Sequence, residues 1–247
     1  MKKLLLIALV FACGTAAASN ISGFGMNVLV GDDVRPEYSG RGRVYVEAVR
    51  GADYSIRLTN PTPYRVAVAL SVDGLNTIDA KHSDAWNASK WILAPYESTV
   101  IAGWQVNDQT ARRFFFTGEN RSYGAYLGQT ENLGIIEAVF YRERRPKFHA
   151  QSPRMEMEEN RKDAPSSSAA GSAAPSDEYA ATGMGGRTTH EVEMVDLDLE
   201  SVPAARVTIR YEFHPQLVRL GVLPRLETPL DRRERARGFG SYCPEPR

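Results

Sequence analysis

The sequence predicts an all-β protein, folded as an antiparallel β-sandwich or jelly roll with a disordered insertion and a disordered C-terminal tail. Short segments in which apolar and polar residues alternate are typical of half-buried strands, and turn-forming residues separate them. A long stretch rich in Ser, Ala, Gly and Pro interrupts this pattern in the second half of the chain.

Most of the predicted strands lie before that stretch. Some alternate with a period of two, and others are more continuously apolar and β-branched, as expected in the middle of a sheet. The predicted strands span residues 43–49, 53–60, 65–72, 98–104 and 134–141. The hydrophobic run RRFFFTG at 112–118 is predicted to lie in the core, with its two arginines at the rim.

The stretch at 147–186 cannot bury enough apolar surface to offset the entropy of ordering it, so it is predicted to be a flexible insertion. Its glycines at 183–186 are interpreted as linker residues. The alternating segments 190–200 and 205–214 are predicted to be strands. Because two strands alone form only a marginal hairpin, we expect both to join the first sheet.

After the last strand, Pro215 at a first helical position and Gly221 at its end predict a single helical turn. The chain therefore divides into a signal peptide (1–18), the first part of the sandwich (19–146), the insertion (147–186), the closing strands with the helical turn (187–224) and the tail (225–247).

The first residues have the features of a secretory signal, with Lys2 and Lys3, an apolar run and small residues up to Ala18. The apolar run is well short of the roughly 20 residues of a membrane span, and no second run could cross a bilayer. Cleavage after Ala18 and a periplasmic or secreted bacterial protein are predicted. Lipidation at Cys13 is the alternative, because VFAC resembles a bacterial lipobox.

Composition and motifs exclude several functions. The chain has 30 Lys+Arg and 30 Asp+Glu, so no charge excess draws it to nucleic acid or to an anionic membrane surface. No nucleotide-binding or G-x-S-x-G motif is present, no cofactor is predicted, and no two histidines have the spacing of a metal site.

His82 and Asp84 could form a base and its orienting partner, but no nucleophile is identifiable. A facing pair of carboxylates, as in glycoside hydrolases, stays an open alternative.

The segment VDGLNTID raises the question of a metal loop. Asp73-Gly74 after an apolar alternation predicts a type I′ hairpin turn. Asp73, Asn76 and Asp79 could supply oxygen ligands to calcium, but three ligands fall short of a full shell and the spacing differs from an EF-hand. A turn is therefore the prediction, and calcium is the alternative.

Aromatic residues on predicted loops are the candidate binding residues. Trp86, Tyr123 and Tyr126 lie on loops, where an apolar ring with a polar tip can anchor a glycan or a protein partner. Packing in the core is the competing interpretation.

If Cys13 leaves with the signal, Cys243 has no intramolecular partner, so it is either a solvated thiol or forms a disulfide with another chain.

Several blocks, in the same order, resemble an uncharacterised group of exported, β-rich bacterial proteins. The resemblance covers residues 25–225 and is carried by YSIRLTNPTPYRVAVALSVDGLNTID, YESTVIAGWQVNDQTARRFFFTG, SYGAYLGQTENLGIIEAVFYRE, ATGMGG and VTIRYEFHPQLVRLGVLP. It implies a secreted β-rich protein and no particular activity or binding residue.

Together these observations predict an exported binding or structural module of the cell envelope that is non-catalytic and uses loop aromatics at one end of the sandwich. The expected partner is an envelope protein or a glycan. The alternative is a carbohydrate-binding or carbohydrate-active protein.

Overall fold

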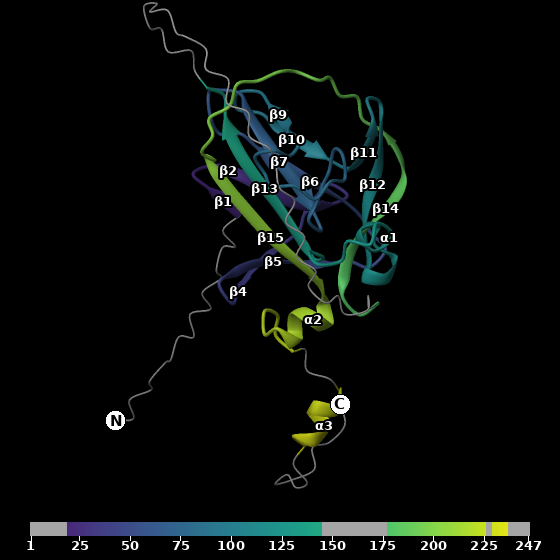
Figure 1. Ribbon diagram of the computed structural model, residues 1–247. Coiled ribbons are helices and arrows are strands. Elements are labelled where there is room, and N and C mark those ends of the chain that lie inside the picture. The colour runs from purple at the N-terminus through teal and green to yellow at the C-terminus, as the bar shows by residue number, and fades with distance from the viewer. Residues whose placement is uncertain (1–18, 145–176, 226–228, 237–247) are drawn as a thin grey trace, which may run out of the picture.

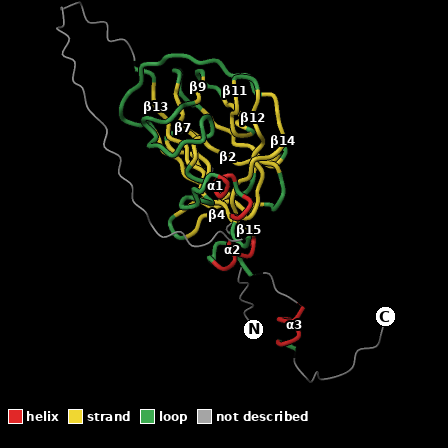
Figure 2. The backbone as a smooth tube through the Cα atoms, turned by 45° about the vertical axis from the view of Figure 1, so that its right-hand side comes forward, coloured by secondary structure: helices red, strands yellow, loops and turns green. Residues whose placement is uncertain are grey.

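The structure is a computed structural model, and it describes residues 19–144, 177–225 and 229–236 (Figure 1). Nearly all of the described chain is β-structure, and its strands form two sheets packed face to face. The predicted β-sandwich is therefore confirmed. Figure 2 shows the strands forming one body, with the short helices α1 and α2 near one end of it.

Eight of the described strands form the first sheet: β1 (Ser19–Ile21), β2 (Phe24–Val30), β3 (Asp33–Val34), β6 (Asp53–Thr59), β10 (Ser98–Ile101), β11 (Gly103–Asn107), β12 (Thr110–Gly118) and β14 (Ala180–Thr189). Seven form the second sheet: β4 (Glu37–Gly40), β5 (Arg43–Ala48), β7 (Val66–Val72), β8 (Leu75–Asn76), β9 (Trp91–Leu93), β13 (Ile135–Arg142) and β15 (Ala205–Phe213). Four described helical segments accompany them: the 3₁₀ turn η1 (Glu119–Arg121), α1 (Tyr123–Tyr126), α2 (His214–Arg219) and α3 (Pro229–Glu234).

The core lies between the inner faces of the two sheets. Phe24 of the first sheet contacts Phe140 of the second with ring centroids 5.0 Å apart, and Phe116 contacts Tyr211 at 5.3 Å. These side chains are buried because alternate residues of each strand point inward. Phe114 and Phe116 are buried while Arg113 is exposed, as the run RRFFFTG predicted.

The pairing is antiparallel except at one place, which the sequence did not predict. β15 pairs in parallel with β5, with Arg210 opposite Tyr45. Parallel neighbours need a long crossover connection, and these two strands are separated by most of the chain.

The tight turn predicted at Asp73-Gly74 is confirmed. Asp73 has φ +54° and Gly74 has φ +76°, and the flanking residues Val72 and Leu75 pair directly. Positive φ at both central residues is the requirement of a type I′ turn.

Two predictions around the insertion are wrong. Residues 190–200 form no continuous strand, and only Leu199 makes an isolated bridge, to Glu143. This segment instead arches over the end of the sandwich between β14 and β15 (Figure 1). The missing strand is β14, which begins at Ala180 and so includes the glycines interpreted as linker residues.

The helical turn after β15 is confirmed as α2, with Pro215 in its first turn and Gly221 at φ +71° beyond its end. Within the tail, where no regular structure was expected, α3 spans Pro229–Glu234. The predicted signal peptide and most of the predicted insertion lie outside the described residues. No helix in the described part of the chain is long and apolar enough to cross a membrane.

Candidate functional site

A loop covers part of the outer face of the second sheet. Residues 77–90 connect β8 to β9, and Ala88 of this loop is buried against Val139 and Tyr141 of β13. These outward-facing residues of β13 would otherwise expose apolar surface to water. The loop therefore has a packed underside although it lies on the surface.

A cavity of about 280 Å³ opens between this loop and the sheet. We call it the loop groove, and its polar lining includes Ser71, His82, Ser83, Asp84, Glu137 and Arg206. Its size is close to the lower end of small-ligand pockets, which start at about 300 Å³.

Glu137 and Arg206 reach the groove from neighbouring strands and form an ion pair. Each has buried neighbours in sequence, such as Ile136 and Val207, because alternate residues face opposite sides of the sheet. The sequence reasoning missed both residues as candidate ligand contacts. Their outward positions in predicted strands were the available signal, but their pairing depended on the register of β13 and β15.

His82 and Asp84 do not form a base and its orienting partner. The Nδ1 atom of His82 lies 2.9 Å from the carbonyl oxygen of Gly74, so Nδ1 carries the proton and Nε2 is left for solvent or ligand. Asp84 instead accepts hydrogen bonds from the amides of Trp86 and Asn87, at 2.9 and 3.1 Å. The Asn87 side-chain and main-chain donors lower the pKa of Asp84, so its carboxylate is ionised at neutral pH.

Trp86 belongs to the loop that covers the groove, and its loop neighbours Ala85 and Ala88 line the cavity, whereas Trp86 itself does not. Its side chain is 44% exposed, yet it packs edge-on against Tyr141 with ring centroids 5.4 Å apart. Lys90 lies 5.7 Å from the centroid of the indole and donates hydrogen bonds to the carbonyls of Trp86 and Ala88. The indole is thus held in place while one part of it faces solvent.

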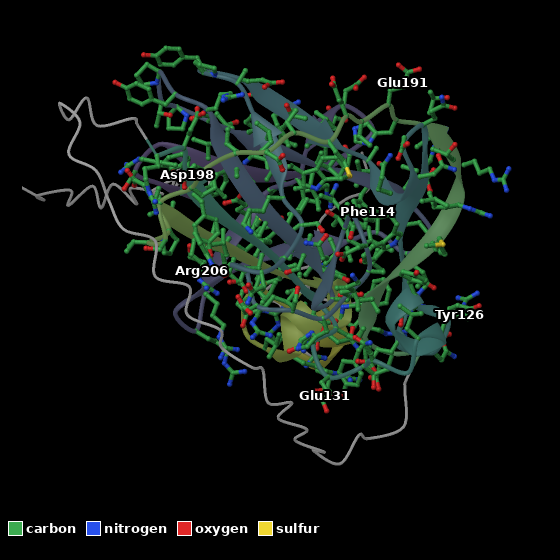
Figure 3. All side chains as sticks on the ribbon, turned by 45° about the horizontal axis from the view of Figure 1, so that its top comes forward. Phe114, Tyr126, Glu131, Glu191, Asp198 and Arg206 are labelled. Carbon is green, nitrogen blue, oxygen red and sulfur yellow. The ribbon has the colours of Figure 1, made fainter. Side chains whose placement is uncertain are left out.

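Tyr123 and Tyr126 lie elsewhere. They stack on each other on α1, with centroids 6.2 Å apart, and Tyr126 is 84% exposed. Tyr123 also packs on the buried Trp104 at 5.0 Å. Figure 3 shows Tyr126 and the groove residue Arg206 on opposite sides of the molecule. Trp86 packs on Tyr141 of the second sheet and Tyr123 packs on Trp104 of the first, so the three predicted binding aromatics lie in two separate places.

The three predicted calcium ligands have different surroundings. Asp73 is 2% exposed, and its carboxylate points into the protein toward the amides of Gly134 and Thr182. Asn76 and Asp79 both bind Ser89, through its carbonyl at 2.8 Å and its hydroxyl at 3.0 Å, and so hold the loop. Within the described residues, no group of three or more His, Cys, Asp or Glu could hold a metal ion.

Cys13 and Cys243 lie outside the described residues, so the predictions of lipidation and of an intermolecular disulfide stay predictions.

Comparisons of this chain with protein-family models, with curated proteins and with solved structures find no match. The resemblance to an exported bacterial group stays an expectation as well.

Proposed function

We propose that the protein is an exported, non-catalytic binding module of the cell envelope and that its ligand binds in the loop groove, against Trp86. The observation that carries this proposal is the exposed but fixed indole on the same loop whose residues Asp84, Ala85 and Ala88 line a polar cavity. A side chain that is already held in place loses little conformational entropy when a ligand packs on it. Tryptophan is also among the residues that most often dominate binding energy.

The absence of a catalytic role rests on the partners of the polar groups. Asp84 is bound to main-chain amides of its own turn, and Glu137 is paired with Arg206. Neither carboxylate orients His82. These groups are arranged to position a loop and to offer hydrogen bonds, and no activated nucleophile is recognisable among them.

A glycan is the ligand class that the groove favours over a protein partner. The apolar face of one sugar ring can pack on Trp86, while the hydroxyl groups of the part in the cavity can bond to the groove residues Glu137, Arg206 and His82. The cavity accepts a small group such as the end of a chain, whereas protein interfaces bury much larger surfaces.

The experiment is a comparison of variants in the native host. The full chain, tagged at its C-terminus, is expressed with its own signal, the intact envelope is crosslinked, and retained protein and carbohydrate are identified. Trp86→Ala is expected to reduce retention of the specific component at least about tenfold, as for a residue that dominates an interface. Tyr126→Ala is the matched control, because it removes a more exposed aromatic from the other site.

The outcomes separate the two parts of the proposal. Retained carbohydrate that depends on Trp86 supports both the site and the ligand class. A retained protein that depends on Trp86 supports the site and overturns the glycan. Retention that Trp86→Ala leaves unchanged, in a variant that unfolds at the wild-type temperature, overturns the site.

A further inference from the structure

The strand β14 lies at an edge of the first sheet, and two carboxylates of the second sheet bind it. Among the described strands, β14 pairs only with β12. On the other side of β14, the amide of Thr182 donates to Asp73 Oδ2 at 2.7 Å and the amide of Ala180 donates to Glu212 Oε2 at 3.1 Å. Side-chain oxygens thus take the place of a neighbouring strand along this half of the edge.

Asp73 is the more deeply buried of the two acids. Its Oδ1 atom accepts hydrogen bonds from the hydroxyl of Tyr211 at 2.5 Å and from the amide of Gly134 at 2.9 Å. With the bond from Thr182, three donors surround the carboxylate. These donors come from β14, β15 and the residue before β13, so the carboxylate joins both sheets.

A chain of hydroxyl groups extends from Asp73 into the core. Thr182 Oγ1 lies 2.6 Å from the hydroxyl of Tyr211 and 2.7 Å from the hydroxyl of Tyr54. When Asp73 is ionised, Tyr211 donates to it, Thr182 donates to Tyr211 and Tyr54 donates to Thr182. When Asp73 is protonated, its proton can be donated to Tyr211 and the chain can run in the opposite direction, because each hydroxyl group can donate or accept.

We propose that Asp73 and Glu212, with the amides of Thr182 and Ala180, form a pH-sensitive latch between β14 and the second sheet, and that this carboxylate latch opens more readily as the pH rises toward neutrality. Its basis is geometric: Asp73, which is 2% exposed, and Glu212, which is half-buried, hold the edge strand of the opposite sheet. Ionising them there places negative charge in the interior.

The direction of the pH effect follows from the proton balance. Burial raises the pKa of Asp73 from 3.8 to about 7, although its hydrogen bonds oppose this, and burial also raises the pKa of Glu212. When the latch opens, the carboxyl of Asp73 regains water and its ordinary pKa. Between pH 3.8 and about 7, the closed state holds one more proton than the open state. The closed state therefore has its full stability below pH 3.8 and loses stability as the pH rises to about 7.

Other titratable groups around the latch do not reverse this direction. Tyr54 and Tyr211 stay protonated, because burial raises the pKa of each well above its ordinary value. Glu119 adds negative charge near Glu212 and raises the pKa of that acid further. On the outer side, His82 and Glu131 line a cavity of about 310 Å³ together with Asp73.

The test is hydrogen exchange of individual amides in the full chain at pH 5 and pH 7, each rate divided by its intrinsic value. For the amides of Thr182 and Ala180, titration of Asp73 alone predicts a rise of about 50-fold in the opening constant between these pH values. In Asp73→Asn the rise should largely disappear, and in the double variant with Glu212→Gln it should disappear completely. Asp32→Asn, the same change at an exposed turn, should keep the full rise.

A second variant keeps the proposal testable if Asp73→Asn does not fold. Tyr211→Phe removes a hydrogen bond that lowers the pKa of Asp73, so the pH at which the opening constant levels off should move upward. An opening constant that is independent of pH in the wild type, or one that rises equally in Asp73→Asn, would overturn the proposal. An unchanged midpoint in Tyr211→Phe would do the same.

Discussion

At the scale of single residues, Asp84 determines how the candidate binding indole is presented. Its Oδ1 atom accepts the amides of Trp86 and Asn87, and its Oδ2 atom accepts the side-chain amide of Asn87 at 2.7 Å. The turn that carries Trp86 is therefore built around one carboxylate. Each bond lies at the surface, so its contribution to the stability of the whole fold is small, but it restricts the turn.

Two substitutions separate the shape of this turn from the charge of Asp84. Asp84→Ala removes every acceptor, whereas the oxygen of Asp84→Asn can still accept both main-chain amides. We expect Asp84→Ala to speed hydrogen exchange at Trp86 and Asn87 and to weaken ligand retention, with a change in unfolding free energy of about 0.5 kcal/mol or less. Asp84→Asn should stay close to wild type. Equal behaviour of the two variants would contradict this role.

For Asp73, the local turn could be predicted from the sequence but the burial of the side chain could not. Its place in a type I′ turn follows from its neighbours, and the structure agrees. Its burial could not be predicted, because its hydrogen-bond partners Gly134, Thr182 and Tyr211 are 61, 109 and 138 residues away. A polar turn residue becomes a core residue only through such distant contacts.

At the scale of elements, β14 is a strand that the amino-acid composition of its segment did not predict. Its glycines suggested a linker, but Gly183 lies against the ring of Phe115 on the adjacent strand β12, and a Cβ atom there would come within 2.3 Å of that ring. The neighbouring Gly186 has open space, with nothing within 4 Å of a Cβ atom. A glycine that fits under an aromatic ring is a packing feature of a strand, and only the paired strand shows it.

This difference gives a matched pair of substitutions within one strand. Gly183→Ala should displace Phe115 and lower the free energy of unfolding by about 1–3 kcal/mol, the usual cost of overpacking. Gly186→Ala should change it by about 0.5 kcal/mol or less. Urea denaturation followed by circular dichroism measures both. If Gly183→Ala were as stable as Gly186→Ala, the packing of β14 on Phe115 would be refuted.

The segment at 190–200 is the opposite case, because it was predicted to be a strand and is not one. Its strict alternation predicted a half-buried strand, but most of its side chains are exposed where it arches over the end of the sandwich. Alternation describes a strand only when a partner covers one face. Strands such as β7 and β13, whose apolar runs are buried by both neighbours and core, were predicted correctly.

At the scale of the whole molecule, the architecture separates the two groups of candidate aromatics. The sandwich could be predicted because alternation and turns are local features of the sequence. The parallel pairing of β5 with β15 and the position of the loop at 77–90 could not, because both depend on contacts between residues far apart in the chain. The groove lies on the outer face of a sheet rather than at one end of the sandwich, where loop aromatics were expected to gather. Tyr126 lies on the opposite side (Figure 3).

The most direct test of the central proposal is photocrosslinking in living cells of the native host. The photoreactive analogue p-benzoylphenylalanine is placed at Ser83, an exposed residue that lines the loop groove, or at Tyr126 as the control. The proposal predicts one specific product from position 83, absent from position 126 and lost when Trp86→Ala is added. No product from position 83, the same products from both positions, or a product that survives Trp86→Ala would contradict it.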